Sequence, residues 1–210
     1  GAHRGAEGGA GMVKVLVASR NQGKVRELEQ VLRELAIEGV ELVSLIDAPA
    51  YPDPVEDGLS FEENALLKAR AGAKATGLPC VADDSGLTVK ALNGMPGILS
   101  ARWSGTHGDD AANNRLLLAQ MADINERAAA FVSCCALATP AGEEHTAVGR
   151  WEGELLREPR GDNGFGYDPL FLPADADGRS SAELTAEEKN ARSHRGKALR
   201  ALAPHLAALK

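Results

Sequence analysis

The segment VADDSGL, residues 81–87, places two adjacent carboxylates and a hydroxyl in an otherwise apolar, strand-like stretch. A buried carboxylate is costly unless it is paired, hydrogen-bonded or bound to a metal ion. Successive strand residues point to opposite faces of a sheet, so Asp83 and Asp84 cannot both line one side. We expect one to enter a site and the other to be held by backbone N–H groups or a cation. An exposed Asp-Asp-Ser-Gly turn explains the segment alone equally well.

A divalent cation would offset the cost of a buried carboxylate. Magnesium binds through one or two protein carboxylates together with phosphate oxygens and water. One strand carboxylate and Glu56, in the loop before a predicted helix, would meet that demand. Asn64 and Lys68 lie one turn apart on the same face of this helix. Taken alone, residues 56–70 are better explained as a capped surface helix.

The turn SRNQGK, residues 19–24, lies between a predicted strand and a predicted helix. Such a turn presents free N–H groups at the positive end of the helix dipole, which suits phosphate. Asn21 can hydrogen-bond there and Lys24 can reach an anion. The turn is not a Walker A loop, because it has only Gly23 where two glycines are needed and Val25 in place of the Ser or Thr. By itself it is better explained as a polar helix cap.

The segment GDNGFGYDPLF, residues 161–171, concentrates aromatic side chains in a chain that contains only 4% of them. Phe165 and Tyr167 alternate with glycines, which allow positive φ and a close backbone approach. An aromatic face with Asp168 beside it suits the stacking of a base and the recognition of its edge. A glycine-rich turn that fills the core with Phe is about as good an interpretation on chemistry alone.

The segment EEKNARSHRGKAL, residues 187–199, is rich in cationic side chains and contains a histidine. Lys189 and Arg192 lie at helical spacing, and His194 and Arg195 follow closely. Such a cluster can bind phosphates or the polar edge of a base. Taken singly, these residues are better explained as solvated charges and a surface histidine.

Hydrophobic periodicity and capping signals predict the elements that must position these residues. Strands are predicted at 13–18, 40–46, 81–89, 128–139 and 145–156, the last two joined as an antiparallel pair. Helices are predicted after the turn at 19–24, with an apolar face from Val25 to Leu35, from Ser60 to Gly77, over 109–122, and from the capping box at Thr185 onward. The final helix presents leucines on one face, and we expect Pro204 to kink or restart it. Strand–helix alternation followed by a hairpin predicts a mixed α/β sheet.

Bulk properties restrict the class of protein. The chain has 210 residues, 44% of them hydrophobic and 25% charged, which is typical of a soluble globular protein. The formal net charge of −7 argues against non-specific duplex binding. No apolar run approaches the roughly 20 residues of a membrane span. We therefore predict a protein that binds neither nucleic acid nor membranes.

The cysteines and the amino terminus complete these expectations. The cysteines at 80, 134 and 135 are odd in number and lack zinc-ligand spacing, which favours reduced core cysteines in a cytoplasmic protein. Residues 1–11 are small and polar and are predicted to be a flexible N-terminal extension or an expression remnant. Residues 12–210 are predicted to form a single domain.

Six segments together resemble a known family. SRNQGK, EDGLSFEENALLKA, ADDSGL, ALNGMPGILSARWSG, GDNGFGYDPLF and EEKNARSHRGKAL occur in the order and approximate spacing of the inosine triphosphate pyrophosphatase family. These enzymes hydrolyse non-standard purine nucleoside triphosphates. The resemblance implies an elongated mixed α/β sheet flanked by helices, with two lobes and a central nucleotide-binding cleft, and usually a homodimer.

The resemblance also implies roles for individual residues. Glu56 and Asp84 would be the ligands of Mg²⁺, and Asp84 the general base that activates water for attack on the α-phosphorus. The residues that would bind the triphosphate or touch the substrate are Ser19, Arg20, Asn21, Gln22, Gly23, Lys24, Lys68 and Ser85. Those that would recognise the base are Phe165, Gly166, Tyr167, Asp168, Lys189, His194 and Arg195. Asp83 would point away from the cleft, held by structural hydrogen bonds.

The implied reaction releases pyrophosphate and a nucleoside monophosphate. Donors facing the 6-oxo group of hypoxanthine or xanthine would be left unpaired against adenine, so ITP, dITP and XTP are expected to be good substrates and ATP a poor one. Rejection of guanine must depend on its 2-position. Two alternatives remain open: a pyrophosphatase for other modified nucleotides, and a non-catalytic purine nucleotide sensor.

Overall fold

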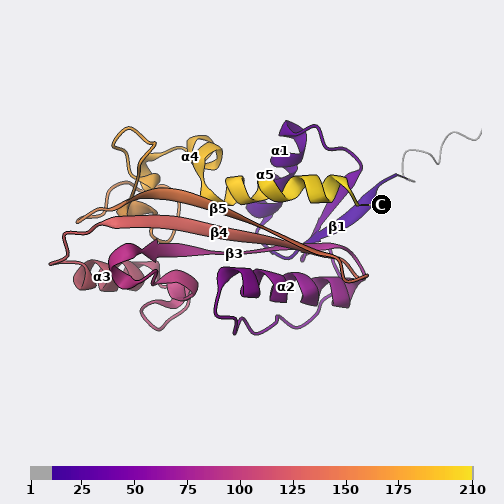
Figure 1. Ribbon diagram of the computed structural model, residues 1–210, viewed down its shortest axis with the longest axis horizontal. Helices are drawn as coiled ribbons and strands as arrows, with labels where there is room; N and C mark the ends of the chain where they lie inside the picture. Colours follow the sequence, from indigo (N-terminus) through magenta and orange to yellow (C-terminus); the bar gives the residue numbers. More distant parts are fainter. Residues whose placement is uncertain (1–10, 210) are drawn as a thin grey trace, which may run out of the picture. The chain divides into compact units, whose positions relative to one another are not determined.

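The computed structural model describes residues 11–209, and the predicted N-terminal extension therefore lies almost entirely outside the described residues (Figure 1). The described chain forms two compact units built from non-contiguous segments. Unit 1 contains the residues up to Asp83, Cys134–Ala147 and the residues from Ala198 on. Unit 2 contains Asp84–Ser133 and Val148–Lys197.

The elements follow the predicted order closely. The strands are β1 Val13–Val17, β2 Val40–Ser44, β3 Cys80–Val89, β4 Ala128–Ala138, β5 Glu144–Leu155 and β6 Phe171–Pro173. The α-helices are α1 Gln22–Glu34, α2 Phe61–Thr76, α3 Asp110–Gln120, α4 Ala186–Arg192 and α5 His194–Ala207. Short 3₁₀ turns are η1 Lys90–Leu92, η2 Gly97–Arg102, η3 Asp168–Leu170 and η4 Ser181–Glu183. Only β6 and the 3₁₀ turns were not predicted.

The strands form a six-stranded sheet in the order β2-β1-β3-β4-β5-β6. Strand β1 runs parallel to β2 and β3, whereas β5 and β6 are antiparallel. Parallel neighbours require crossover helices, and a short turn suffices for an antiparallel pair, as between β4 and β5. The predicted mixed α/β sheet with flanking helices is confirmed.

The alternation of strand side chains builds two cores in unit 1. Val15 and Val17 belong to one buried cluster with α1 and α5, whereas Leu16, between them, belongs to another with α2. The same alternation separates Cys135 from Cys134 on β4. Figure 1 accordingly shows α1 and α5 on one side of β1 and α2 on the other.

The three cysteines are buried, as predicted for core cysteines. Cys80 and Cys134 lie in the cluster under α2. Burial raises the pKa of the Cys80 thiol to about 12, because the apolar surroundings disfavour the thiolate. These thiols are therefore packing groups rather than nucleophiles.

Unit 2 has its own core, which contains four buried aromatic residues. Trp151 lies edge-on to Phe171, with ring centroids 5.4 Å apart, and Phe131 contacts both rings. Leu117 of α3 and Met121, the C-cap residue of that helix, belong to the same buried cluster. Phe171, on the unpredicted strand β6, is fully buried, so the aromatic segment at 161–171 does contribute to the core.

Capping explains where α2 begins and ends. The Ser60 side chain accepts a hydrogen bond from the Glu63 N–H, and Gly77 ends the helix in the left-handed conformation with φ +71°. The Glu63 carboxylate accepts from the Leu59 N–H at 2.7 Å rather than from Ser60. The predicted helix start is thus correct, and the reciprocal bond is displaced by one residue.

One detail of the predicted helices is wrong. Leu35 does not extend the apolar face of α1, because it is the C-cap residue and is 43% exposed. The last helix does not restart at Pro204, since α5 runs from His194 to Ala207 with Pro204 inside it. The predicted kink at Pro204 stays a prediction.

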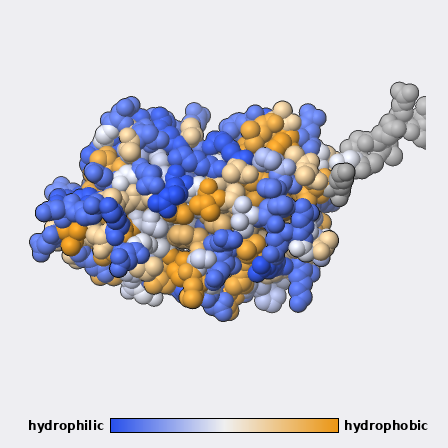
Figure 2. All heavy atoms as spheres, in the orientation of Figure 1, coloured by the Kyte–Doolittle hydropathy of each residue, from blue (hydrophilic) through white to orange (hydrophobic). Residues whose placement is uncertain are grey.

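Hydrophilic residues cover most of the face shown in Figure 2, and the hydrophobic ones occur in small groups. Within residues 11–209, the structure contains no helix that is both long and apolar enough to cross a membrane.

Helix α2 packs closely on the sheet at Gly72. A Cβ there would lie 2.5 Å from Cys80 Sγ and 3.0 Å from Leu16 Cδ2. We predict that Gly72→Ala lowers the free energy of unfolding by about 1–2 kcal/mol, because overpacking outweighs the gain in helix propensity. Urea denaturation measures this change. The matched control is Ala75→Gly, at an exposed position of α2, which should lose about 1 kcal/mol through propensity alone. A more stable Gly72→Ala protein would contradict the close contact.

Candidate nucleotide-binding site

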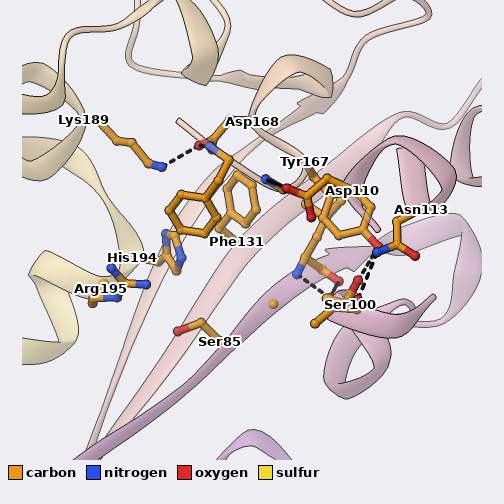
Figure 3. A pocket seen from close by; sticks show the side chains of 15 residues that line it. Ser85, Ser100, Asp110, Asn113, Phe131, Tyr167, Asp168, Lys189, His194 and Arg195 are labelled. Carbon is orange, nitrogen blue, oxygen red and sulfur yellow. Dashed lines mark hydrogen bonds and ion pairs between the residues drawn. The ribbon is translucent and has the colours of Figure 1, made fainter. Parts of the chain in front are cut away.

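A pocket of about 160 Å³ lies within unit 2 (Figure 3). Pockets that take whole drug-sized ligands measure roughly 300–1,000 Å³, so this one suits a single ring system rather than a whole nucleotide. Its lining residues are Ser85, Gly86, Leu87, Ser100, Ala101, Asp110, Asn113, Phe131, Phe165, Gly166, Tyr167, Asp168, Lys189, His194 and Arg195. All seven residues predicted to recognise the base are among them.

The two sides of the pocket differ in charge. Figure 3 shows Lys189, His194 and Arg195 on one side, from α4 and the start of α5. Ser100 and Asp110 lie on the other side. The pocket thus offers hydrogen-bond donors mainly from the side formed by α4 and α5.

Asp168 is the buried centre of the loop at 161–168. It is 2% exposed, and its carboxylate accepts hydrogen bonds from the Phe165 N–H at 3.0 Å and the Ser181 hydroxyl at 2.7 Å. The Lys189 ammonium lies 2.5 Å from the same carboxylate. A Cβ at Gly164, where φ is +75°, would lie 2.1 Å from Asp168 Oδ2. The loop therefore needs a glycine at this position in order to close around the carboxylate.

Phe165 and Tyr167 have different surroundings. Phe165 is 64% exposed, with the Lys189 ammonium 4.6 Å from its ring centroid. Tyr167 is buried, its hydroxyl donates to the Ser100 carbonyl at 2.6 Å, and burial raises the pKa of its phenol. The exposed ring of Phe165 is thus the aromatic surface that a planar ligand can reach, while Tyr167 anchors the loop.

Ser193 separates two helices where the sequence suggested one continuous cluster. Its backbone is extended, and its hydroxyl accepts from the Gly196 N–H at 3.2 Å, which caps the start of α5. His194 is therefore at the first turn of α5, 9% exposed, with its ring stacked on Phe131 at 4.9 Å. Lys189 projects from the preceding helix, α4.

The capping box predicted at Thr185 is present and begins α4. Glu188 accepts from the Thr185 N–H, and its contact with Arg179 is 2.7 Å. These partners, with Arg179 the strongest, lower the pKa of Glu188 to about 2. The box fixes the helix that carries Lys189.

In unit 1 the turn at 19–24 begins α1, as expected of a helix cap. The Asn21 side chain accepts from the Gly23 N–H at 2.9 Å, and the Ser19 hydroxyl accepts from the Asn21 N–H at 3.0 Å. Gln22 donates to the Ser44 hydroxyl at 3.3 Å, and Arg20 is exposed, 3.5 Å from an Asp53 oxygen. Both interpretations of the turn remain compatible with these contacts.

Two lysines of unit 1 converge on Asp83. Lys24 Nζ lies 3.0 Å from Asp83 Oδ1, and the Lys68 ammonium donates to the Asp83 backbone carbonyl. Asp83 is thus held by a cation, one of the two alternatives expected for the aspartate that does not enter the site. Because this cation is Lys24, a predicted phosphate ligand, Asp83 lies beside predicted site residues.

Glu56 lies close to Lys68, with Oε1 3.1 Å from its ammonium. The loop that carries Glu56 is tied to α2, since the buried Asn64 side chain accepts from the Gly58 N–H at 2.8 Å. Glu56 and Lys68 belong to unit 1, as does Asp83, and unit 2 begins at Asp84.

Carboxylate oxygens of this kind suit Mg²⁺, which needs only one or two of them when phosphates supply other ligands. Across residues 11–209, the structure has no group of three or more His, Cys, Asp or Glu that could hold a metal ion by themselves. The donor set therefore fits an ion shared with a phosphorylated ligand and does not fit a site made by the protein alone.

Several lining residues had no predicted role. Ser100 lies in the segment ALNGMPGILSARWSG, which supported the family resemblance. Nothing in that segment, however, indicated a role for Ser100 itself. The Asp-Asp-Ala-Ala-Asn-Asn run at the start of α3 could have indicated Asp110 and Asn113, since its polar residues recur at helical spacing. Phe131 lies in a uniformly apolar strand, and no local pattern identifies it.

A model of the Ham1 family matches residues 15–205. The chain belongs to the Ham1 family. Curated relatives named dITP/XTP pyrophosphatase include one from Corynebacterium efficiens, 63% identical over 204 residues, which cover 94% of this chain and 99% of the relative. Another, from Mycobacteroides abscessus, is 63% identical over 196 residues, covering 92% of this chain and 95% of the relative. The resemblance inferred from the six segments is confirmed.

Solved structures agree with this Ham1 family membership. A HAM1 protein from Coxiella burnetii has a TM-score of 0.86 and 42% identity, covering 94% of this chain and all of its own. A structure described as nucleoside-triphosphatase / dITP/XTP pyrophosphatase from Mycobacterium abscessus has a TM-score of 0.78 and 63% identity, covering 92% of this chain and 100% of its own. The fold class is therefore that of Ham1 proteins.

The contact between Lys189 and Asp168 yields a stability prediction. We expect Lys189→Met to lower the free energy of unfolding by about 3–5 kcal/mol, because it leaves a buried carboxylate without its cation. Lys189→Met combined with Asp168→Asn should recover part of that loss. Chemical denaturation measures both. Lys74→Met, at an exposed position of α2, is the control and should change stability by less than about 1 kcal/mol. Equal losses in the single and double variants would show that the pairing is unimportant.

Proposed function

We propose that this Ham1 protein hydrolyses non-standard purine nucleoside triphosphates, namely ITP, dITP and XTP, to the nucleoside monophosphate and pyrophosphate, and so cleanses the nucleotide pool. The observation that carries the proposal is the ring-sized pocket of unit 2, where the exposed face of Phe165 lies beside Lys189, His194 and Arg195. The activity is also the one named for relatives that are 63% identical over nearly their full length.

The pocket is suited to a base with an oxygen at its 6-position. The purine stacks on Phe165, and donors from Lys189, His194 and Arg195 face the 6-oxo group. Adenine presents an amino donor there, which would leave buried donors unpaired. One of these donors is already directed, since the Lys189 ammonium is held by Asp168 and retains further N–H groups.

The lysines of unit 1 are proposed to bind the phosphates. Lys24 and Lys68 each contact a carboxylate or carbonyl oxygen, so their ammonium groups are held in place before any anion is bound. The start of α1, around Gly23, adds the positive end of the helix dipole, which favours an anion. Ser85 touches the substrate from β3, and its hydroxyl donates to the buried Ser133 hydroxyl at 2.8 Å.

Asp84 is proposed as the general base. It takes a proton from the water whose oxygen forms a bond to the α-phosphorus, while the bond from that phosphorus to the bridging oxygen breaks and pyrophosphate leaves. The protein's contribution is mainly positioning and charge neutralisation, since phosphoryl transfer needs little covalent chemistry.

Glu56 and Asp84 are the residues that would hold Mg²⁺. When bound, the ion would neutralise phosphate charge and polarise the phosphoryl oxygens. The pairing of Glu56 with Lys68 at 3.1 Å supports this role, because it places a carboxylate that can bind Mg²⁺ beside an ammonium that can bind phosphate. A homodimer, a cytoplasmic location and a single domain over 12–210 remain predictions.

A nucleotide panel tests the substrate class. With Mg²⁺, we expect kcat/KM for ITP, dITP and XTP to exceed that for ATP by roughly 10²–10⁵-fold, because adenine leaves donors unpaired. Pyrophosphate release is the measurement, with EDTA as the metal control. Preferred turnover of modified pyrimidine or methylated nucleotides would favour the other house-cleaning activity. Binding of ITP without pyrophosphate release would favour a sensor.

The role of Asp84 is tested by Asp84→Asn, which keeps the shape of the side chain and removes its basicity. We predict that kcat for ITP falls by roughly 10²–10⁴-fold, the usual contribution of a general base. Asp123→Asn, at an exposed position beyond α3, is the control and should leave kcat unchanged. Near-wild-type turnover by a folded Asp84→Asn protein would remove Asp84 from the mechanism.

A further inference from the structure

Helix α3 binds both backbone groups of one glycine in the base loop. The Gly166 N–H donates to Asp110 Oδ2 at 2.9 Å, and the Asn114 side-chain amide donates to the Gly166 carbonyl at 3.1 Å. Asp110 and Asn114 are four residues apart, so they lie on the same face of the helix. The Asp110 carboxylate accepts from the N–H, and the Asn114 amide donates to the carbonyl. This pairing fixes which way the backbone runs past the helix at Gly166.

The helix that makes this contact is itself firmly held. Leu117 and Met121 are fully buried in the core of unit 2. The buried Asn113 side chain also fixes the helix, because it accepts a hydrogen bond from the Ser104 N–H at 2.7 Å and donates one to the Ala101 carbonyl at 3.0 Å. Because α3 is fixed in the core, the hydrogen bonds from Asp110 and Asn114 hold Gly166 in a defined position relative to this helix.

Gly166 lies between the two aromatic residues of the loop. Its φ of +59° is in the left-handed region, which a glycine adopts at little cost. On one side, the Tyr167 hydroxyl is bound to the Ser100 carbonyl, and on the other the Phe165 N–H is bound to Asp168. The ring of Phe165 is 64% exposed and lies outside the core, so its position depends on the Lys189 ammonium beside it and on the hydrogen-bonded peptides that flank it.

We infer that Asp110 and Asn114 are positioning residues for base recognition. By binding both backbone groups of Gly166, they hold the ring of Phe165 in the position in the pocket at which a purine stacks on it. This inference rests on the proposed function and extends it to two side chains of α3. Both act through the loop and on the bound base, so their loss weakens binding of the nucleotide and spares the step at the α-phosphorus.

The sharpest test is Asn114→Asp, which keeps the size of the side chain but places an acceptor against the Gly166 carbonyl. We expect KM for ITP to rise at least tenfold, the equivalent of one lost hydrogen bond together with repulsion, while kcat stays within about twofold. Asn114→Ala, which only removes the donor, should give a smaller rise in KM. It also keeps the test informative if Asn114→Asp does not fold.

Asp110 provides the matching pair of variants. Asp110→Ala should raise KM, whereas Asp110→Asn retains an oxygen that can accept from the Gly166 N–H and should restore most of the affinity. The control is Arg115→Gln, at an exposed position on the same helix, with KM unchanged. A purely structural role for α3 would lower the thermal midpoint without this split between KM and kcat.

Calorimetric measurement of inosine monophosphate binding distinguishes failure of this inference from failure of the proposed function. If wild-type protein turns over ITP and the variants have unchanged KM and unchanged affinity for the monophosphate, the inference is overturned and the proposed function stands. If wild-type protein neither hydrolyses ITP nor binds the monophosphate, both fail. Weaker monophosphate binding by Asn114→Asp, with Arg115→Gln unaffected, supports the inference.

Discussion

The pocket of unit 2 depends on one buried charge. Asp168 is nearly inaccessible, and an isolated carboxylate at such a position would be strongly unfavourable. Its cost is offset by donors from three different segments: the Phe165 N–H, the Ser181 hydroxyl and the Lys189 ammonium. Because each donor has to reach the same two oxygens, the carboxylate brings together the glycine-rich loop, the turn η4 and helix α4. The arrangement leaves Phe165 exposed above it.

Lysine–carboxylate pairs also occur in unit 1. There, Lys24 lies against Asp83 and Lys68 against Glu56, and both lysine side chains are partly buried. Charge pairs of this kind contribute little to stability when exposed, but they fix where long side chains point. Such preorganisation is what phosphate recognition needs, since it reduces the entropy lost when the anion binds.

Features with local sequence signals were predicted correctly, whereas contacts between distant residues were not. Strand β1, helix α1 and the caps at Ser60 and Thr185 were predicted because their signals lie within a few residues of one another. All seven residues predicted to recognise the base line one pocket. The partner of Asp83 was not predicted, because Lys24 is 59 positions away in the chain. Phe131, Asp110 and Asn114 were missed because their contacts are made across the fold.

The sequence by itself determined the fold class, the order of the elements, the family and the set of side chains capable of chemistry, since periodicity, caps and motif order are local or linear properties. Only the tertiary structure decided which side chains are paired. Lys24 lies against Asp83, Lys68 against Glu56, and Gly166 against α3, because hydrogen bonds and ion pairs act over about 3 Å in space, whatever the separation along the chain.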